Sequence, residues 1–185
     1  MDVPNRQDDA AVDAALIERW KRGDQRAAAE IVKRHADALA RFAVSTGERD
    51  ELDELVQDTF VRAFNSIDSF RAESSFRTWL FTILRHLVLD RKRAERRRGN
   101  RVELEEDHAV QEYNALDALV ADETAQRVTS AMARLSPLQK EVFALRVTEG
   151  LAYGEIAKLV GSTEGACRVH YHNAMRSVKE FLDDA

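Results

Sequence analysis

Cysteine, proline and glycine are all scarce in this chain of 185 residues, which contains one Cys, two Pro and seven Gly. A single cysteine excludes a disulfide framework and a cysteine-based zinc cage, and it fits a reducing, cytosolic compartment. Because helix-breaking residues are few while Ala, Leu, Arg and Glu are abundant, the composition predicts an all-α protein. The length is sufficient for one domain or for two small ones.

Long apolar runs are absent as well. No stretch approaches the roughly 20 apolar residues that a membrane-spanning helix needs, so we expect no direct membrane insertion. The acidic N-terminus lacks a basic region followed by an apolar run, so it is not expected to be a signal peptide. We expect a cytoplasmic protein whose residues 1–13 are frayed or disordered.

Charges of opposite sign are segregated along the chain, although the net charge is only −5. Residues 71–101 hold ten basic residues against three acidic ones, and residues 102–125 hold eight acidic residues and no Lys or Arg. Such segregation indicates that different segments meet different partners, although a charged run can also be only a solvated surface. The basic block continues an amphipathic helix, which favours contact with a polyanion.

Apolar periodicity predicts four helices in the N-terminal half, over 13–22, 24–45, 50–66 and from 76 toward 101. Asp24 is the expected N-cap of the second helix, and Ser74 or Ser75 is the expected N-cap of the fourth. The fourth helix has the clearest apolar stripe, made of Phe76, Trp79, Leu80, Ile83, Leu84, Leu87 and Val88. The residues predicted to lie off this stripe include Arg77, Thr78, Arg85 and Arg91.

The C-terminal segment predicts a helix-turn-helix. Ser136 and Gln139 form a capping box around Pro137, which starts one helix, and a shorter helix over 153–160 ends at Gly161. A final helix then runs to about residue 182. Helices separated by such a short turn are typical of a helix-turn-helix, although they can also be only packing units. The final helix buries a stripe of Cys167, Tyr171, Ala174, Val178 and Phe181 in this prediction.

Chemistry other than binding has little support in the residues. Cys167, His170 and His172 are close in sequence, but they leave a helix in different directions and cannot converge on one metal ion. The chain has no Gly-rich phosphate loop, no GxSxG elbow and no HExxH motif. We therefore expect no metal, no cofactor, no catalytic residue and no enzymatic activity.

Taken in order, the motifs resemble those of bacterial RNA polymerase sigma factors, in particular the extracytoplasmic-function (group 4) subfamily of the sigma-70 family. The run from Asp53 to Phe64 resembles region 2, and Phe70 to Leu80 is similar to the segment that follows it in this subfamily. Three short runs resemble region 4, and they are residues 135–139, 155–157 and 164–166. The resemblance implies a region 2 domain over 14–98, a flexible acidic linker over 99–126 and a region 4 helix-turn-helix domain over 127–185.

The resemblance also implies three sets of contact residues. Those carried over for core RNA polymerase are Asp53, Glu54, Leu55, Val56, Gln57, Asp58, Phe60 and Val61. Those carried over for the −10 promoter element are Ser69, Arg71, Ser74, Arg77, Thr78, Arg85, Arg91 and Arg93. Those carried over for the −35 duplex are Ser162, Thr163, Glu164, Arg168, Val169, His172, Asn173 and Arg176. Trp79 lies on the apolar stripe, so we expect it in the core and not stacked on a base.

Several positions depart from the usual pattern of the subfamily, so exact base contacts are not carried over. The subfamily commonly has an acidic residue at the position of Gly154, Val at Cys167, and Arg at His170 and Asn173. The linker has two open interpretations: it threads a basic channel of the polymerase, or it is an ordinary disordered spacer. About 25 extended residues reach at most ~80 Å, which is enough for two promoter elements separated by ~70 Å of duplex.

The expected function is therefore promoter-specific transcription initiation with core RNA polymerase. An anti-sigma factor, often membrane-anchored in this family, is a further expected partner. The alternative is a stand-alone helix-turn-helix regulator with an N-terminal sensing or dimerisation domain, which would bind specific DNA without polymerase. A third interpretation, a mimic that sequesters a regulator, is disfavoured by the basic helix over 76–101.

Overall fold

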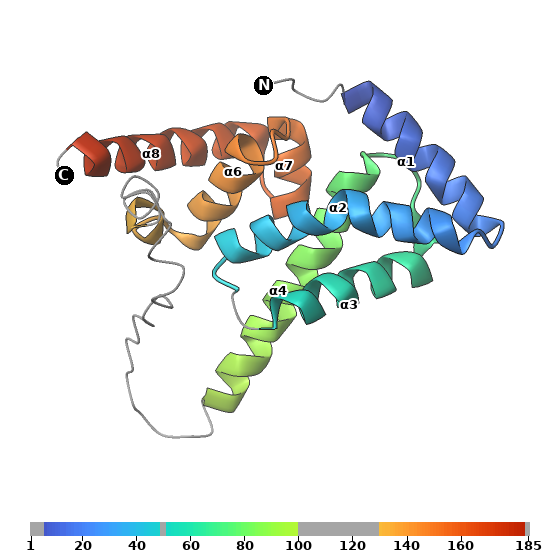
Figure 1. The fold of residues 1–185 in the computed structure, drawn as a ribbon. Coiled ribbons are helices and arrows are strands. Elements are labelled where there is room, and N and C mark those ends of the chain that lie inside the picture. The colour runs from blue at the N-terminus through green and yellow to red at the C-terminus, as the bar shows by residue number, and fades with distance from the viewer. Residues whose placement is uncertain (1–5, 49–50, 100–129, 184–185) are drawn as a thin grey trace, which may run out of the picture. The chain divides into compact units, whose positions relative to one another are not determined.

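The computed structural model describes residues 6–48, 51–99 and 130–183 (Figure 1). Within these ranges every regular element is a helix, and the chain divides into two compact units, Met1–Arg91 and Lys92–Ala185. This confirms the predicted all-α fold with two helical domains. Apart from residue 99, the linker predicted over 99–126 lies outside the described residues. No described helix combines the length and the apolar character that crossing a membrane requires.

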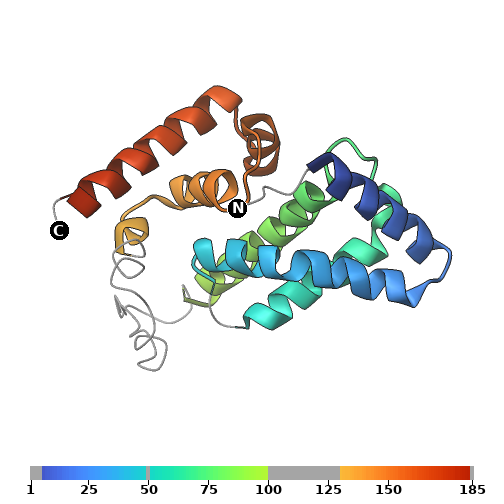
Figure 2. The same cartoon turned by 45° about the horizontal axis from the view of Figure 1, so that its top comes forward.

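The described part of the first unit contains α1 (Arg6–Lys21), α2 (Gln25–Ser45), α3 (Leu52–Asn65), the 3₁₀ turn η1 (Ile67–Ser69) and α4 (Phe76–Gly99) up to Arg91, where the unit ends. Helices α1 and α3 both pack on α2, and α4 passes across α2 (Figures 1 and 2). Large side chains fill the core between them. The fully buried ones include Ile31, Leu39, Phe42, Leu55, Leu80, Phe81 and Leu84.

Asp24 starts α2, as the sequence predicts. Its carboxylate accepts hydrogen bonds from the backbone N–H groups of Arg26 (3.0 Å) and Ala27 (3.4 Å). It also accepts from the Nη2 of Arg19 at 2.7 Å. The hydrogen bond from Arg19, together with the backbone bonds, lowers the pKa of Asp24. The N-cap is thus anionic at neutral pH, which suits the positive end of a helix dipole.

Helix α1 begins at Arg6, earlier than the predicted start at residue 13, so residues 6–13 are helical in the structure. Two acidic residues of this segment bond to side chains of α2, which include Arg34. Asp9 accepts from the Nη2 of Arg34 at 2.9 Å, and the buried Asp13 contacts Arg34 Nε at 3.1 Å and His35 Nε2 at 3.0 Å. Partial burial works to lower the pKa of Arg34, but its bonds to the two carboxylates outweigh this and raise it. Pairing across the two helices thus compensates the burial of these polar groups.

The second unit contains α6 (Pro137–Val147), α7 (Tyr153–Val160) and α8 (Glu164–Asp183), with a helical segment at 130–133 before them. Helices α6, α7 and α8 pack on one another around a small aliphatic core. The predicted capping box is confirmed, because Ser136 Oγ accepts from Gln139 N (3.3 Å) and Ser136 N donates to Gln139 Oε1 (2.9 Å). The chain leaves α7 through Gly161, whose φ of 70° is left-handed and favours glycine.

Candidate polymerase and nucleic-acid interfaces

Helices α7 and α8 form the predicted helix-turn-helix, joined through Gly161, Ser162 and Thr163. The Oγ1 of Thr163 accepts from Ala166 N at 3.2 Å and so caps α8. The inner face of α8 is the predicted one, since its buried residues are Cys167, Ala174 and Val178, whereas Tyr171 and Phe181 are half-buried. Burial raises the pKa of the Cys167 thiol, and the nearby Glu164 charge adds to this effect.

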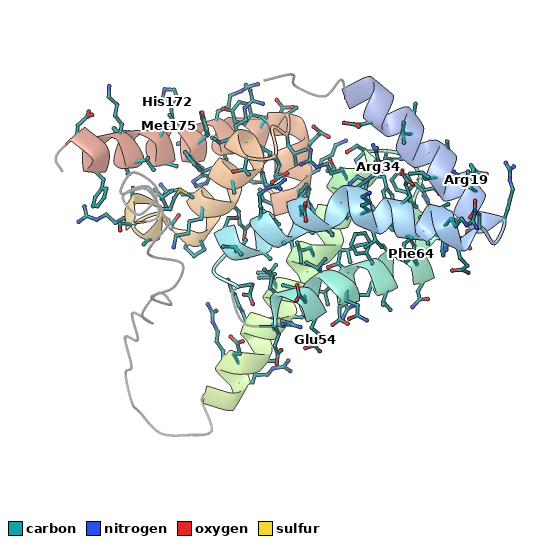
Figure 3. The ribbon with its side chains drawn as sticks, viewed as in Figure 1. Arg19, Arg34, Glu54, Phe64, His172 and Met175 are labelled. Carbon is teal, nitrogen blue, oxygen red and sulfur yellow. The ribbon has the colours of Figure 1, made fainter. Side chains whose placement is uncertain are left out.

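The side of α8 opposite this stripe is open to solvent and chemically varied. Arg168, His172 and Arg176 are exposed, Asn173 is half-buried, and the apolar Val169 is 58% exposed. His172 and Met175 point away from α6 in Figure 3. The Nη2 of Arg176 donates to Asn173 Oδ1 at 3.4 Å. An open depression runs along this side, lined by Tyr153, Arg168, Val169, His172 and Asn173. The predicted −35 residues of the helix body therefore lie together on one accessible side.

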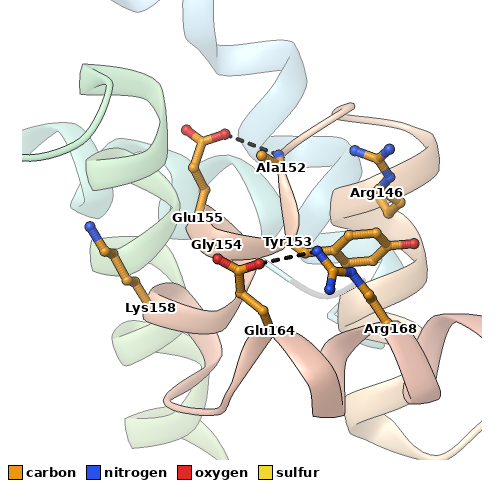
Figure 4. Close-up of a pocket in the computed structure, with 8 residues that line it drawn as sticks. All are labelled: Arg146, Ala152, Tyr153, Gly154, Glu155, Lys158, Glu164 and Arg168. Atoms are coloured by element: carbon orange, nitrogen blue, oxygen red, sulfur yellow. Dashed lines mark hydrogen bonds and ion pairs between the residues drawn. The ribbon is translucent and has the colours of Figure 1, made fainter.

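Tyr153, at the start of α7, contacts two arginines from different helices (Figure 4). The guanidinium carbon of Arg146 lies 4.8 Å from the ring centroid, and that of Arg168 lies 5.4 Å from it. Arg146 Nη1 also donates to the backbone oxygen of Leu151 at 2.8 Å. Arg146 and Tyr153 are not among the contact residues predicted from the sequence. The sequence does contain a signal for this contact: an arginine lies in the last turn of one predicted helix, and an aromatic residue lies at the start of the next.

Glu164 points toward α7 in the structure. Its Oε2 accepts from Arg168 Nη2 at 3.2 Å, and a Cβ added to Gly154 would lie 2.9 Å from its Oε1. Gly154 is one of the positions where the sequence departs from the subfamily pattern. The missing side chain leaves the room that the Glu164 carboxylate occupies.

The predicted polymerase residues on α3 divide into three groups by exposure. Asp53, Glu54, Gln57 and Val61 are exposed (Val61 is 49% exposed), while Val56 and Asp58 are half-buried. Glu54 projects from the side of α3 that faces away from α2 in Figure 3. Leu55 and Phe60 are buried in the core of the first unit, so the prediction of a surface contact is wrong for these two. They share the inner face of α3 with the buried Thr59 and Ala63.

Phe70, in the loop before α4, packs with Phe76 and Trp79 of the first turn of α4 to form an aromatic cluster. Ring centroids lie 5.4 Å apart for Phe70 and Phe76, 5.2 Å for Phe70 and Trp79, and 5.7 Å for Phe76 and Trp79. Trp79 is half-buried in this cluster and not sealed in the core as expected. Ala72 has a φ of 55°, a left-handed conformation that non-glycine residues rarely adopt. The loop thus combines aromatic surface with an unusual backbone turn.

Thr78 is not a surface residue. Its side chain is buried, its backbone N–H donates to Ser75 Oγ at 3.1 Å, and its Oγ1 lies 2.8 Å from the same oxygen. The predicted DNA contact of Thr78 is therefore wrong, whereas Ser75 is confirmed as the cap of α4. Phe81 is fully buried although it lies off the predicted stripe, because it meets Phe42 of α2 with ring centroids 5.3 Å apart. Helix α4 is covered on more sides than one stripe predicts.

The other residues predicted for the −10 element extend from the loop along α4. Ser69, Arg71 and Arg93 are exposed, and the half-buried ones are Ser74, Arg77, Arg85 and Arg91. The guanidinium carbon of Arg77 lies 5.6 Å from the Phe81 ring centroid, and Arg91 Nη1 lies 3.5 Å from Glu51 Oε2. Within the described residues, no three His, Cys, Asp or Glu side chains gather in a way that could hold a metal ion.

Comparison with known proteins gives matches over both units. Residues 31–98 match the family model of sigma-70 region 2, and residues 125–178 match that of sigma-70 region 4. The ECF RNA polymerase sigma factor SigC of Mycobacterium tuberculosis is 33% identical over 168 residues, covering 87% of this chain and 85% of the relative. The ECF RNA polymerase sigma-E factor of Haemophilus influenzae is 29% identical over 176 residues, covering 90% of this chain and 93% of the relative.

Solved structures with the same fold include two complexes. CnrH in complex with the cytosolic domain of CnrY aligns with a TM-score of 0.70 and 28% identity, over 94% of this chain and 98% of that chain. The sigma factor RpoE of Bartonella quintana, in complex with the anti-sigma factor NepR, aligns with a TM-score of 0.67 and 27% identity. That alignment covers 83% of this chain and 95% of the other.

Proposed function

This chain belongs to the extracytoplasmic-function subfamily of sigma-70 factors, and on that premise we propose that it binds core RNA polymerase and directs promoter-specific transcription initiation. The observation that carries the proposal is the succession of region 2 and region 4 in one chain, at residues 31–98 and 125–178. The first unit would take the −10 element and the second the −35 duplex. Members of this family act as initiation factors, and the proposed role requires no catalytic step from the chain itself.

The polymerase-binding surface is proposed to be the exposed side of α3. Asp53, Glu54 and Gln57 offer charge and hydrogen-bonding groups there, and Val61 offers an apolar side chain that is 49% exposed. Protein interfaces have an apolar centre and a polar rim, so Val61 suits the centre of this surface and the polar groups suit its rim. The half-buried Val56 and Asp58 extend this surface at its edge.

The −35 duplex is proposed to meet the open side of α8. A recognition helix presents such a side to the major groove. Arg168 and Arg176 can donate to guanine, Asn173 can pair with adenine, and Val169 fits the methyl group of thymine. His172 lies on the same side. Thr163 and the half-buried Ser162 support the start of this helix.

The −10 element is proposed to meet the loop and the arginines of α4. Ser69, Arg71 and Ser74 lie in or beside the loop, and Arg77, Arg85, Arg91 and Arg93 follow along the helix. Cationic side chains follow the phosphates of a single strand, and aromatic rings accept unstacked bases. The half-buried Trp79, packed with Phe70, lies beside this track and supports the proposal.

An anti-sigma factor is proposed as a regulatory partner. The aligned CnrH and RpoE structures are complexes with CnrY and with the anti-sigma factor NepR, respectively. The proposed site of action is the cytoplasm, where the polymerase and its template are. A membrane-anchored anti-sigma protein would hold the chain at the membrane until a signal releases it.

Run-off transcription tests the proposal directly. Purified core RNA polymerase is incubated with a genomic fragment library, with and without the chain, and transcript starts are mapped. We expect a limited set of starts that depends on the chain. Sequence-specific DNA binding by the chain alone, with no effect on the polymerase, would favour the stand-alone regulator instead.

Two surface variants test the division of labour between α3 and α4. Val61→Glu should weaken core polymerase binding in a pull-down, because it places a charge at the apolar centre of the interface. The double variant Arg71→Glu, Arg93→Glu should leave that binding intact and impair promoter opening, measured by permanganate reactivity of unpaired thymines. Both variants change exposed residues, so circular dichroism should match the wild type. Identical defects in the two assays would contradict the division.

A further inference from the structure

A buried hydrogen bond between α1 and α2 leads toward the aromatic cluster at the start of α4. Asp13 Oδ1 lies 3.0 Å from His35 Nε2, and their side chains are 5% and 7% exposed. Because a carboxylate oxygen only accepts hydrogen bonds, Nε2 is the donor. The same oxygen accepts from Arg34 Nε at 3.1 Å, which orients the carboxylate. A bond closed off from water is costly to break, so it holds the His35 ring in one orientation.

The ring of His35 packs against Phe76, the first residue of α4. The two ring centroids lie 5.7 Å apart and the ring planes meet at 69°, an edge-to-face contact. Phe76 is buried and in turn contacts Phe70 at 5.4 Å and Trp79 at 5.7 Å. Ring pairs prefer particular geometries, so a turn of one ring changes the fit of the next. A series of contacts therefore connects α1, through α2, with the aromatic cluster.

Phe70 and Trp79 form the accessible end of this series. Both are half-buried, whereas the members behind them are buried. The loop that carries Phe70 includes Ala72, whose φ of 55° is a conformation that persists only when surrounding contacts support it. Rings that accept unstacked bases act best when packing and buried hydrogen bonds hold them in place.

We propose that Asp13 and His35 are positioning residues for the −10 element. Asp13 fixes the His35 ring, the ring seats Phe76, and Phe76 holds Phe70 and Trp79 in the orientation that receives unpaired bases. The inference rests on the proposed function, because it takes the aromatic cluster as a surface for those bases. Neither Asp13 nor His35 touches DNA, and both act through Phe76.

Two measurements on the same variants test this proposal. Promoter opening is measured by permanganate reactivity of unpaired thymines, with the chain and core RNA polymerase on a promoter found by run-off transcription. The packing of Trp79 is measured by acrylamide quenching of its fluorescence in a Trp20→Phe background, where Trp79 is the one remaining tryptophan. A pull-down with core polymerase shows whether the variants still bind it.

His35→Gln separates the ring from the hydrogen bond. The amide of glutamine can still donate to Asp13, but no ring remains to pack against Phe76. Promoter opening should fall by about two- to tenfold, the factor that one aromatic pair contributes. Quenching of Trp79 should increase, while binding to core polymerase stays at the wild-type level. Unchanged opening would overturn the proposal, because the hydrogen bond alone would then suffice.

Asp13→Ala should cause the same two changes, because it releases the His35 ring. Asp13→Asn should restore both measurements toward the wild-type values, since its amide oxygen can accept from His35 Nε2 and from Arg34 Nε. Equal defects in Asp13→Ala and Asp13→Asn would overturn the part that this hydrogen bond plays.

Two variants of α1 are the matched controls. Asp9→Ala removes the other carboxylate that bonds Arg34, and Ile17→Ala removes a buried apolar side chain one turn after Asp13. Ile17→Ala should lower the urea midpoint of the first unit. Both should leave promoter opening and Trp79 quenching unchanged at a temperature where circular dichroism shows every variant to be folded. An equal loss of opening from Ile17→Ala would reduce the Asp13 effect to stability and overturn the proposal.

Failure of the proposed function would be a different result. The wild-type chain would then produce no unpaired thymines with core polymerase. Quenching of Trp79 requires neither polymerase nor DNA, so it would still test the series of contacts. Unchanged quenching in His35→Gln would overturn the positioning role in that case as well.

Discussion

The two units differ in how many of their predicted contact residues are exposed. In the second unit α8 keeps a buried stripe apart from an open side, so Arg168, Val169 and His172 stay exposed as predicted. In the first unit the predicted contact residues Leu55 and Thr78 are buried. A helix that is covered on one side separates packing from function, whereas a helix covered on several sides mixes them. Periodicity is therefore a better guide to function in the second unit than in the first.

The interiors of the two units differ as well. The first unit buries large rings and, between α1 and α2, the polar side chains of Asp13 and His35, and the half-buried Arg34 bonds to Asp13. In the described part of the second unit, the fully buried large side chains are Val142, Leu145, Ile156 and Cys167, and none is aromatic. Both tryptophans of the chain, Trp20 and Trp79, belong to the first unit. Tryptophan fluorescence consequently reports on one unit alone, which makes the comparison measurable.

Truncating a buried aromatic ring of the first unit should cause the largest loss of unfolding free energy, and this loss should be confined to that unit. Phe42→Ala removes a fully buried ring that meets Phe81, and the expected loss of unfolding free energy is about 3–5 kcal/mol. The measurement is urea unfolding followed by tryptophan fluorescence. The matched change in the second unit is Ile156→Ala. It should lower the free energy of unfolding measured by circular dichroism by about 2–5 kcal/mol. The urea midpoint measured by tryptophan fluorescence should stay unchanged. A joint shift of both signals would show that the units unfold together.

Breaking the buried polar group should have the next largest effect. Asp13→Ala leaves His35 without its carboxylate partner in the interior and removes one of the two carboxylates on Arg34, at an expected cost of about 2–3 kcal/mol. Tryptophan fluorescence during urea unfolding measures this loss. Asp9→Ala removes the partly exposed member of the same group and should cost less than about 1 kcal/mol. Equal costs for the two variants would contradict the dependence on burial.

Local signals in the sequence account for most of what was predicted correctly. Asp24, Ser75 and the pair Ser136 and Gln139 cap helices through bonds to residues two or three positions away, so the sequence alone contains both partners. Gly161 is equally local, because its conformation depends on the backbone at one residue. The helices and the helix-turn-helix followed from such signals.

The features that were missed depend on contacts between distant residues. The early start of α1 reflects the pairing of Asp9 and Asp13 with Arg34, and the burial of Phe81 reflects its contact with Phe42. Arg146 reaches Tyr153 only through the turn that brings α6 beside α7. Periodicity within one helix carries no information on these partners. Which residues of each predicted site are exposed could therefore be learned only from the structure.

A lost helix cap should affect the second unit alone and more weakly. Ser136→Ala removes the hydroxyl that accepts from Gln139 N and should destabilise α6 by about 1 kcal/mol. The urea midpoint measured by circular dichroism should fall, while the urea midpoint measured by tryptophan fluorescence should stay constant. Gln139→Ala removes the reciprocal half of the box and should produce a shift in the same direction. A change in the tryptophan signal for either variant would contradict the assignment of this cap to the second unit.

The smallest expected effect is the pH dependence that Cys167 gives to the second unit. Burial raises the pKa of this thiol above its ordinary value of 9.0, with a further contribution from Glu164. The folded state therefore holds the proton more tightly than the unfolded state. Its contribution to stability is complete below about pH 9 and declines as the pH rises toward the folded pKa, by at most about 1.4 kcal/mol per pH unit.

Unfolding at pH 7 and at pH 9.5 measures this contribution, with Cys167→Ala as the comparison. The alanine variant should be less stable at both pH values because of the lost packing, but its circular dichroism midpoint should fall less between them. The tryptophan signal of the first unit should show the same pH dependence in both proteins. Because this is the one cysteine of the chain, any difference in alkaline behaviour between the two proteins belongs to that thiol. Equal alkaline losses of stability in wild type and variant would contradict the prediction, because they would show that the Cys167 thiol has the same pKa in the folded and unfolded states.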